Sequence, residues 1–174
     1  MTNAQVTADN DLLAGKYLTF ALGDEEYGVA IVKIREIIGM MKITSMPKMP
    51  EHVKGVINLR GLVIPIVDLR LRFGMEEVEH TERTCIIVVE VENHDSNHLV
   101  VGTVVDSVSE VLNIKADEIE DAPAMGAALD DDFLLGMAKI EGGVKILLDI
   151  DRALRPEVPD MMAGVGEHDQ PANP

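Results

Sequence analysis

Residues 55–70 read GVINLRGLVIPIVDLR, two short runs rich in Val, Ile and Leu that meet at Arg60 and Gly61. β-Branched residues favour strands, and a glycine between two such runs is typical of a tight turn. The stretch therefore predicts a β-hairpin with Arg60 in its turn. Asp68 follows the second apolar run, where its side chain is expected to cap the next turn of the backbone.

The same pattern recurs later in the chain. Residues 136–151 (GMAKIEGGVKILLDID) overlay residues 55–70 at a constant offset of 81, with two glycines and an aspartate aligned. Residues 101–111 (VGTVVDSVSEV) overlay residues 27–37 (YGVAIVKIREI) at an offset of 74. Because both matches occur in the same order, they favour an ancient duplication. The different offsets place an insertion in the second half, within residues 110–136.

Further short β-rich runs lie between turn formers, and they set the fold class. They read KYLTFAL, YGVAI, TCIIVVEV, HLVVGTVV and VKILLDI. No segment shows a long helical period, and single helical turns are expected only at Ala116–Ile119 and Asp151–Leu154. Several short strands at this spacing predict an all-β protein of the barrel or sandwich type. The four repeated glycines (Gly55, Gly61, Gly136, Gly142) are interpreted as barrel corners and tight turns.

The domain is predicted to span residues 16–155 and to consist of two halves, residues 16–80 (the first half) and residues 81–155 (the second half), with strands open to exchange at their ends. Each half is a unit of about 70 residues, a size at which a small barrel gains stability by packing on another. Residues 1–15 and 156–174 carry few large apolar groups and are expected to be mobile tails.

Composition excludes several classes of partner. Of the 174 residues, 15 are basic and 31 acidic, a formal net charge of −16, which repels nucleic acid and anionic lipid surfaces. The sequence shows no signal peptide and no apolar run long enough to span a bilayer, which predicts a cytoplasmic protein without direct membrane insertion. Cys85 stands alone in an apolar run and is predicted to lie in the core.

Motifs of catalysis and metal binding are weak. Ser45 and Lys48 have the spacing of a serine acyltransferase pair, but Pro47 lies between them and the companion motifs are missing. The pair His94 and His98 lies in a stretch typical of a hairpin loop, and the three aspartates 130–132 lack the alternation of a calcium loop. No phosphate-binding glycine motif occurs. We therefore predict no catalytic residue, no metal site and no cofactor.

Two charged residues remain as candidates for partner contacts. Arg60 in its predicted turn can project a guanidinium that makes paired hydrogen bonds, although physical reasoning alone favours an ordinary exposed arginine. Glu36 is open to the same two interpretations, a contact or a solvated charge on a strand edge.

Five strings resemble the family of the bacterial chemotaxis coupling protein CheW over about residues 16–155. They read LGDEEYGVAI, IREI, HVKGVINLRGLVIPIVDLR, VVGTVVDSVSEVL and LLDIDRAL. The departures lie in the tails and in the hairpin from Glu92 to His98, which is longer than is usual. The resemblance implies two intertwined five-stranded SH3-like barrels, in agreement with the duplication.

The resemblance also implies a role and a set of site residues. The role is to bridge transmembrane chemoreceptors and the histidine kinase CheA, with no catalytic residue. Gly55 resembles a position that affects the kinase contact. The residues that resemble the receptor-facing groove are Ile34, Glu36, Ile37, Arg60, Val108 and Val111. Two alternatives stay open: a scaffold of this type in a non-flagellar system, and a small-molecule-binding barrel or enzyme.

Overall fold

The computed structural model describes residues 12–92, 97–120 and 133–154. The predicted C-terminal tail, most of the predicted N-terminal tail, His94 and the three aspartates 130–132 lie outside the described residues. No helix in the described part of the chain is long and apolar enough to cross a membrane.

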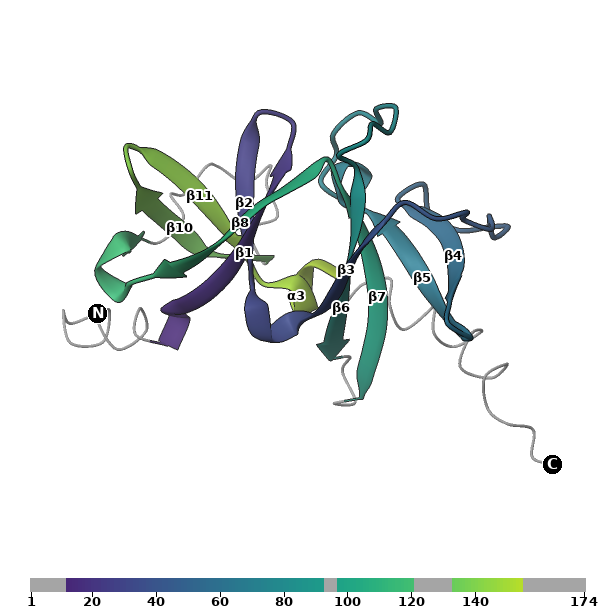
Figure 1. Ribbon diagram of the computed structural model, residues 1–174, viewed down its shortest axis with the longest axis horizontal. Helices are drawn as coiled ribbons and strands as arrows, with labels where there is room; N and C mark the ends of the chain where they lie inside the picture. The colour runs from purple at the N-terminus through teal and green to yellow at the C-terminus, as the bar shows by residue number, and fades with distance from the viewer. Residues whose placement is uncertain (1–11, 93–96, 121–132, 155–174) are drawn as a thin grey trace.

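The all-β prediction is confirmed (Figure 1). One curled sheet, barrel A, has the strand order β8 (Ser107–Ile114), β1 (Gly15–Leu22), β2 (Glu25–Ala30), β11 (Gly143–Leu148), β10 (Leu134–Ile140) and β9 (Ile119–Glu120). The other, barrel B, has the order β3 (Ile34–Gly39), β6 (Cys85–Glu92), β7 (His98–Val105), β5 (Leu62–Asp68) and β4 (Val53–Leu59). The short helical segments are η1 (Ile31–Lys33), α2 (Leu69–Arg72), η2 (Ala116–Glu118) and α3 (Ile150–Leu154).

Each barrel combines strands of both halves of the chain. In barrel A the hairpin β1–β2 of the first half pairs with β8 and, in parallel, with β11 of the second half. In barrel B the hairpin β6–β7 of the second half pairs with β3 and, in parallel, with β5 of the first half. The two five-strand orders are therefore equivalent, and barrel A gains a sixth strand only because two residues, β9, pair with the outer edge of β10.

The repeated segments adopt the same structure. Residues 55–70 form β4, a two-residue turn, β5 and the start of α2, and residues 136–151 form β10, the equivalent turn, β11 and the start of α3. Arg60 and Gly61 have positive φ angles of 53° and 91°, and Glu141 and Gly142 have 49° and 79°. Positive φ at both central residues defines the type I′ turn, whose twist matches that of the flanking strands. The tight turns predicted at Gly61 and Gly142 are thus confirmed.

The other two repeated glycines do not lie in tight turns. Gly55 and Gly136 lie inside strands, beside register shifts. A Cβ on Gly55 would lie 2.1 Å from the carbonyl oxygen of Thr44, and one on Gly136 would lie 2.8 Å from that of Glu120. Both glycines allow a neighbouring backbone segment to approach the strand, which a pattern of apolar residues does not reveal.

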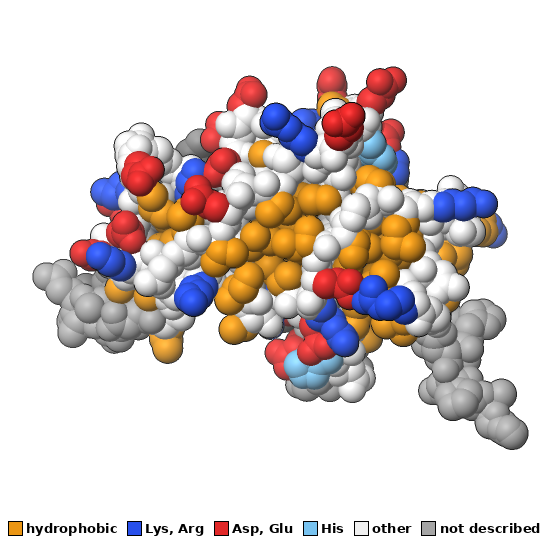
Figure 2. Space-filling model, in the orientation of Figure 1, with side chains coloured by type: hydrophobic (Ala, Val, Ile, Leu, Met, Phe, Trp, Pro, Cys, Tyr) orange, Lys and Arg blue, Asp and Glu red, His pale blue; other side chains and the backbone are white. Residues whose placement is uncertain are grey.

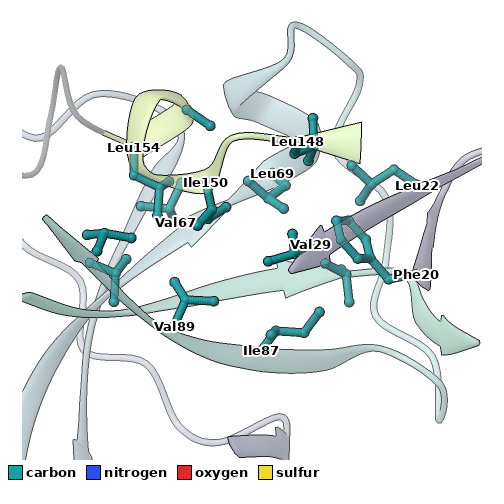
Figure 3. Packing of buried hydrophobic residues seen from close by; sticks show 14 of the residues in the cluster. Phe20, Leu22, Val29, Val67, Leu69, Ile87, Val89, Leu148, Ile150 and Leu154 are labelled. Carbon is teal, nitrogen blue, oxygen red and sulfur yellow. The ribbon is translucent and has the colours of Figure 1, made fainter. Parts of the chain in front are cut away.

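The largest hydrophobic core is shared between the barrels (Figure 3). It brings together Phe20 and Leu148 of barrel A, Val67 and Ile87 of barrel B, and Ile150 of α3. Smaller clusters occupy the individual barrels, one around Ile64 and Ile86 in barrel B and one around Tyr17 and Leu147 in barrel A. Because the shared core is the largest, each barrel depends on the other for much of its buried apolar surface.

Cys85 differs from its prediction in degree. The side chain packs against the shared core but is only partly buried. Burial raises the pKa of its thiol above the ordinary value, which makes the thiolate form less accessible.

Candidate partner-binding site

The predicted receptor-facing residues lie mainly on β3 and β8, and each of these strands is an edge strand of its barrel. The two strands are equivalent in the repeat, and each contains a one-residue bulge, at Arg35 in β3 and at Ser109 in β8. A bulge twists an edge strand and re-aims its side chains, and it hinders pairing with another sheet. The edges are thus adapted to contacts made through side chains.

Four apolar members of the predicted set occupy equivalent positions on these two strands. Ile37 of β3 is 44% exposed, and Val111 of β8 is 51% exposed. Ile34 and Val108 are partly buried and pack against the shared core. The structure therefore brings Ile34 and Val108 to one core, with an exposed apolar side chain three residues further along each strand. Figure 2 shows hydrophobic side chains gathered over the middle of this face, where β8 and β3 lie in Figure 1.

Glu36 and Arg60, which the sequence left undecided, contact each other. An N–H of the Arg60 guanidinium donates to Glu36 Oε2, and the two side chains are 68% and 32% exposed, respectively. The Asn58 side chain accepts a hydrogen bond of 2.8 Å from the Gly61 N–H and thereby supports the type I′ turn that presents Arg60. The turn and the pair hold the guanidinium at a defined place on an exposed surface.

Gly55, the predicted kinase-contact residue, is not a surface group. It lies buried in β4, with a φ of 140°, against the backbone of Thr44. Thr44 and Val56 exchange two backbone hydrogen bonds of 2.8 and 2.9 Å, which closes the outer edge of β4 at this point. The position therefore shapes β4 and the segment that covers it.

The repeat identifies residues that the sequence reasoning did not select. Glu110 of β8 is equivalent to Glu36, and Glu141 of the β10–β11 turn is equivalent to Arg60, so the corresponding corner of barrel A carries two acids in place of an ion pair. Beside it, Glu26 contacts Lys145 and accepts a hydrogen bond of 3.2 Å from Ser109 at the bulge. The hydrogen bond from Lys145 lowers the pKa of Glu26. The alignment of the two halves was the signal that locates these residues.

The remaining candidates from the sequence are not assembled into a site. Ser45 and Lys48 lie exposed in an irregular segment, and His98 lies exposed beside Glu90 and Glu92 on β6 and β7. Within the described residues no group of three or more His, Cys, Asp or Glu side chains is arranged to hold a metal ion. A shallow pocket of about 390 Å³ is lined by Glu77, Val78, Glu79 and His80, which include none of the predicted site residues.

Comparison with known proteins agrees with this architecture. A family model described as CheW-like domain matches residues 16–158. The chain is 39% identical over 142 residues to the chemotaxis protein CheW of Klebsiella aerogenes, with 82% of each chain covered. It is 39% identical over 151 residues to the chemotaxis protein CheW of Rhizobium meliloti, with 87% of this chain and 93% of that one covered.

A solved structure is similar as well. The crystal structure of the scaffolding protein TtCheW from Thermoanaerobacter tengcongensis matches with a TM-score of 0.68 at 34% identity, over 78% of this chain and 88% of that chain. The region matched by the family model contains both barrels and both edge strands. The chain therefore belongs to the CheW-like domain family.

Proposed function

We propose that this protein is a chemotaxis adaptor that couples transmembrane chemoreceptors to the histidine kinase CheA at receptor arrays in the cytoplasm, and that it has no catalytic activity of its own. Family membership and the similarity to a scaffolding protein support this role. The observation that carries the site is the exposure of Ile37 and Val111 at equivalent positions of two edge strands, with the Arg60–Glu36 pair on the same barrel as Ile37.

This face suits an amphipathic helix such as the cytoplasmic tip of a receptor. Ile37 and Val111 provide exposed apolar area, which is the contact that the apolar stripe of a helix requires. Ile34 and Val108 are fixed by the shared core, so the surface that they border is rigid and loses little conformational entropy on binding. A few such anchors give a modest interface that permits exchange of partners.

Arg60 would set the orientation of the receptor. A guanidinium has five N–H donors, and the contact with Glu36 leaves others for a carboxylate or carbonyl group of the partner. Gly55 would act on the kinase contact indirectly, because it fixes the shape of β4 and of the segment that includes Thr44.

The test is the charge reversal Arg60→Glu. The new carboxylate would repel the receptor carboxylate or carbonyl group that Arg60 is proposed to contact. A tenfold loss of affinity corresponds to only about 1.4 kcal/mol. We expect receptor affinity to fall at least about tenfold and receptor-dependent kinase activation to be lost. Direct binding to CheA and the melting temperature should stay close to the parent values, because an exposed ion pair contributes at most about 1 kcal/mol.

Two controls separate recognition from stability. Arg83→Glu makes the same change of charge on the exposed loop between α2 and β6 and should leave receptor affinity unchanged. The exchange Glu36→Arg/Arg60→Glu keeps an internal ion pair in reverse order, and we expect it to keep the parental melting temperature without restoring receptor binding. Equal receptor affinity for Arg60→Glu and its parent would refute the proposed site.

A further inference from the structure

The two halves of the chain cross at two equivalent junctions, and an ion pair links the halves at each. Each junction has three parts. One half supplies a short helical segment and the backbone N–H at the end of the first strand of its hairpin. The other half supplies the crossover between two of its strands. In the first junction these parts are α2, the β7–β8 crossover and Gly23. In the second they are α3, the β2–β3 crossover and Glu92.

At the first junction the helix supplies the cation. Arg70 of α2 donates two hydrogen bonds of 2.7 Å to the carboxylate of Asp106, which lies between β7 and β8. The Gly23 N–H donates to the same carboxylate at 2.8 Å. Burial alone raises the pKa of Asp106, but the bonds from Arg70 and Gly23 outweigh it and the pKa lies below its ordinary value. The side chains are only 15% and 25% exposed, so the pair is partly screened from water.

At the second junction the helix supplies the anion. Asp151 of α3 lies 2.6 Å from Lys33 Nζ at the end of η1, and it accepts a hydrogen bond of 2.9 Å from the Glu92 N–H. Asp151 is equivalent to Arg70 in the repeat, and Lys33 lies one residue beyond the position equivalent to Asp106. The two junctions thus share one layout with the charges exchanged.

This exchange places both cations on one half and both anions on the other. Lys33 and Arg70 belong to the first half, and Asp106 and Asp151 belong to the second. The wider composition has the same bias, since residues 16–80 contain nine basic and nine acidic residues, and residues 81–155 contain six and sixteen.

We propose that the junction charges direct each half of this chain to pair with the unlike half and to reject the like half of a second copy. Because the halves are equivalent, the hairpin of a first half has the geometry to join the strands of another first half. Arg70 would then face Lys33 at both junctions, and in a pair of second halves Asp151 would face Asp106. Like charges in partly buried positions oppose such pairing, which is how proteins reject a competing partner of the same shape.

The test changes selectivity while it keeps an ion pair at each junction. The variant Lys33→Asp/Asp151→Arg reverses the second junction, so that it copies the layout of the first. Unlike halves still attract at both junctions, but like halves now attract as well. Reversing both junctions, with Arg70→Asp/Asp106→Arg added, makes each half uniform in charge again and should restore the rejection of like halves.

The readout uses the folded full chain, cut at a protease site introduced between the exposed residues His80 and Thr81. After denaturation and refolding of the cut protein, native mass spectrometry counts pairs of unlike and like halves. The parent should give unlike pairs, the double variant at least about tenfold more like pairs, and the quadruple variant the parental pattern. High salt should reduce the difference in like pairs between the parent and the double variant, because salt screens the charges at the junctions.

The uncut chain gives a second readout, since like halves can then meet only between copies and appear as oligomers after refolding at high concentration. The double variant should form more oligomer than either the parent or the quadruple variant, when the three proteins are compared at matched melting temperatures. Equal counts of like pairs, or equal oligomer, in the parent and the double variant would overturn the proposal. A quadruple variant that forms as many like pairs as the double variant would overturn the proposal as well.

Discussion

The buried carboxylate of Asp68 caps the start of α2, although its burial disfavours the charged form. It is 4% exposed and accepts hydrogen bonds of 2.9 and 3.4 Å from the backbone N–H groups of Arg70 and Leu71 at the start of α2. Burial raises its pKa above the ordinary value, although both hydrogen bonds act in the opposite direction. The cap that the sequence predicted is therefore confirmed, but its charge is disfavoured by the surroundings.

We expect Asp68→Ala to lower the free energy of unfolding by about 1 kcal/mol, because the cap is lost, and Asp68→Asn to lower it by less, because the amide oxygen can still accept. With a folded pKa above the unfolded one, the penalty on the charged form appears as pH rises through the range between the two values. In urea unfolding, the Asn variant should therefore gain stability relative to the parent as pH rises above the ordinary aspartate pKa of about 4. Equal losses for Ala and Asn at every pH would contradict this account.

Substitution of Gly55 tests whether this residue, which was predicted to affect the kinase contact, matters for the stability of the fold. A methyl group there would overlap the Thr44 carbonyl, and the φ of 140° is unfavourable for other residues. We expect Gly55→Ala to destabilise by about 3 kcal/mol, the sum of strain and overpacking. Gly61→Ala is the matched control, because its φ is also positive but its Cβ would meet open space. It should lose only about 1 kcal/mol in the same denaturant titration. Similar losses at the two positions would show that the approach of Thr44 is unimportant.

At the scale of elements, the two parallel strand pairs hold the halves together. Gly102 of β7 lies opposite Ile66 of β5, and Gly28 of β2 lies opposite Leu147 of β11. A Cβ on Gly102 would lie 2.5 Å from Ile66 Cδ1, and one on Gly28 would lie 3.1 Å from Leu147 Cδ2. Each glycine leaves room for an apolar side chain of the partner strand, so the side chain and the glycine together fix the register.

We expect Gly102→Ala to destabilise by about 2 kcal/mol through overpacking of this contact. Ile66→Val removes the Cδ1 atom and should by itself cost about 1 kcal/mol. If the contact is the cause, the double variant should lose at least about 1 kcal/mol less than the sum of the single losses, measured as a double-mutant cycle. Gly102→Ala with Ile57→Val is the control, since Ile57 is not among the nearest neighbours of the added methyl group and the losses should add. Additive losses in both cycles would contradict the proposed register contact.

Elements determined by local chemistry could be predicted from the sequence, and those determined by distant contacts could not. The turn at Arg60, the cap at Asp68 and the helical turn of α3 follow from residues within a few positions. The choice of β11 as partner of β2 depends on packing between residues more than 100 positions apart, which no local pattern encodes. The Arg60–Glu36 contact was missed for the same reason, although both residues were selected.

At the scale of the whole molecule, the arrangement of cores makes the barrels interdependent. The shared core receives residues from both barrels and from α3, while each barrel retains only a small cluster of its own. In addition, every barrel contains strands from both halves, so neither half can leave without opening both barrels. The sequence repeat suggested two units, but the structure joins them into one.

We therefore expect the protein to unfold as a single cooperative unit. Ile64→Val removes a methyl group from the cluster of barrel B, and Ile119→Val does the same in the cluster of barrel A, each at a cost of about 1 kcal/mol. If the protein is a single cooperative unit, its slowest-exchanging amides open only when both barrels open. Either substitution should then lower the free energy of opening equally for such amides of β11 in barrel A and of β6 in barrel B. Hydrogen exchange under conditions in which opening is a rapid equilibrium measures this quantity strand by strand. If the loss were confined to the barrel that carries the substitution, the barrels would be separate folding units, and the shared core would contribute less to stability than its size indicates.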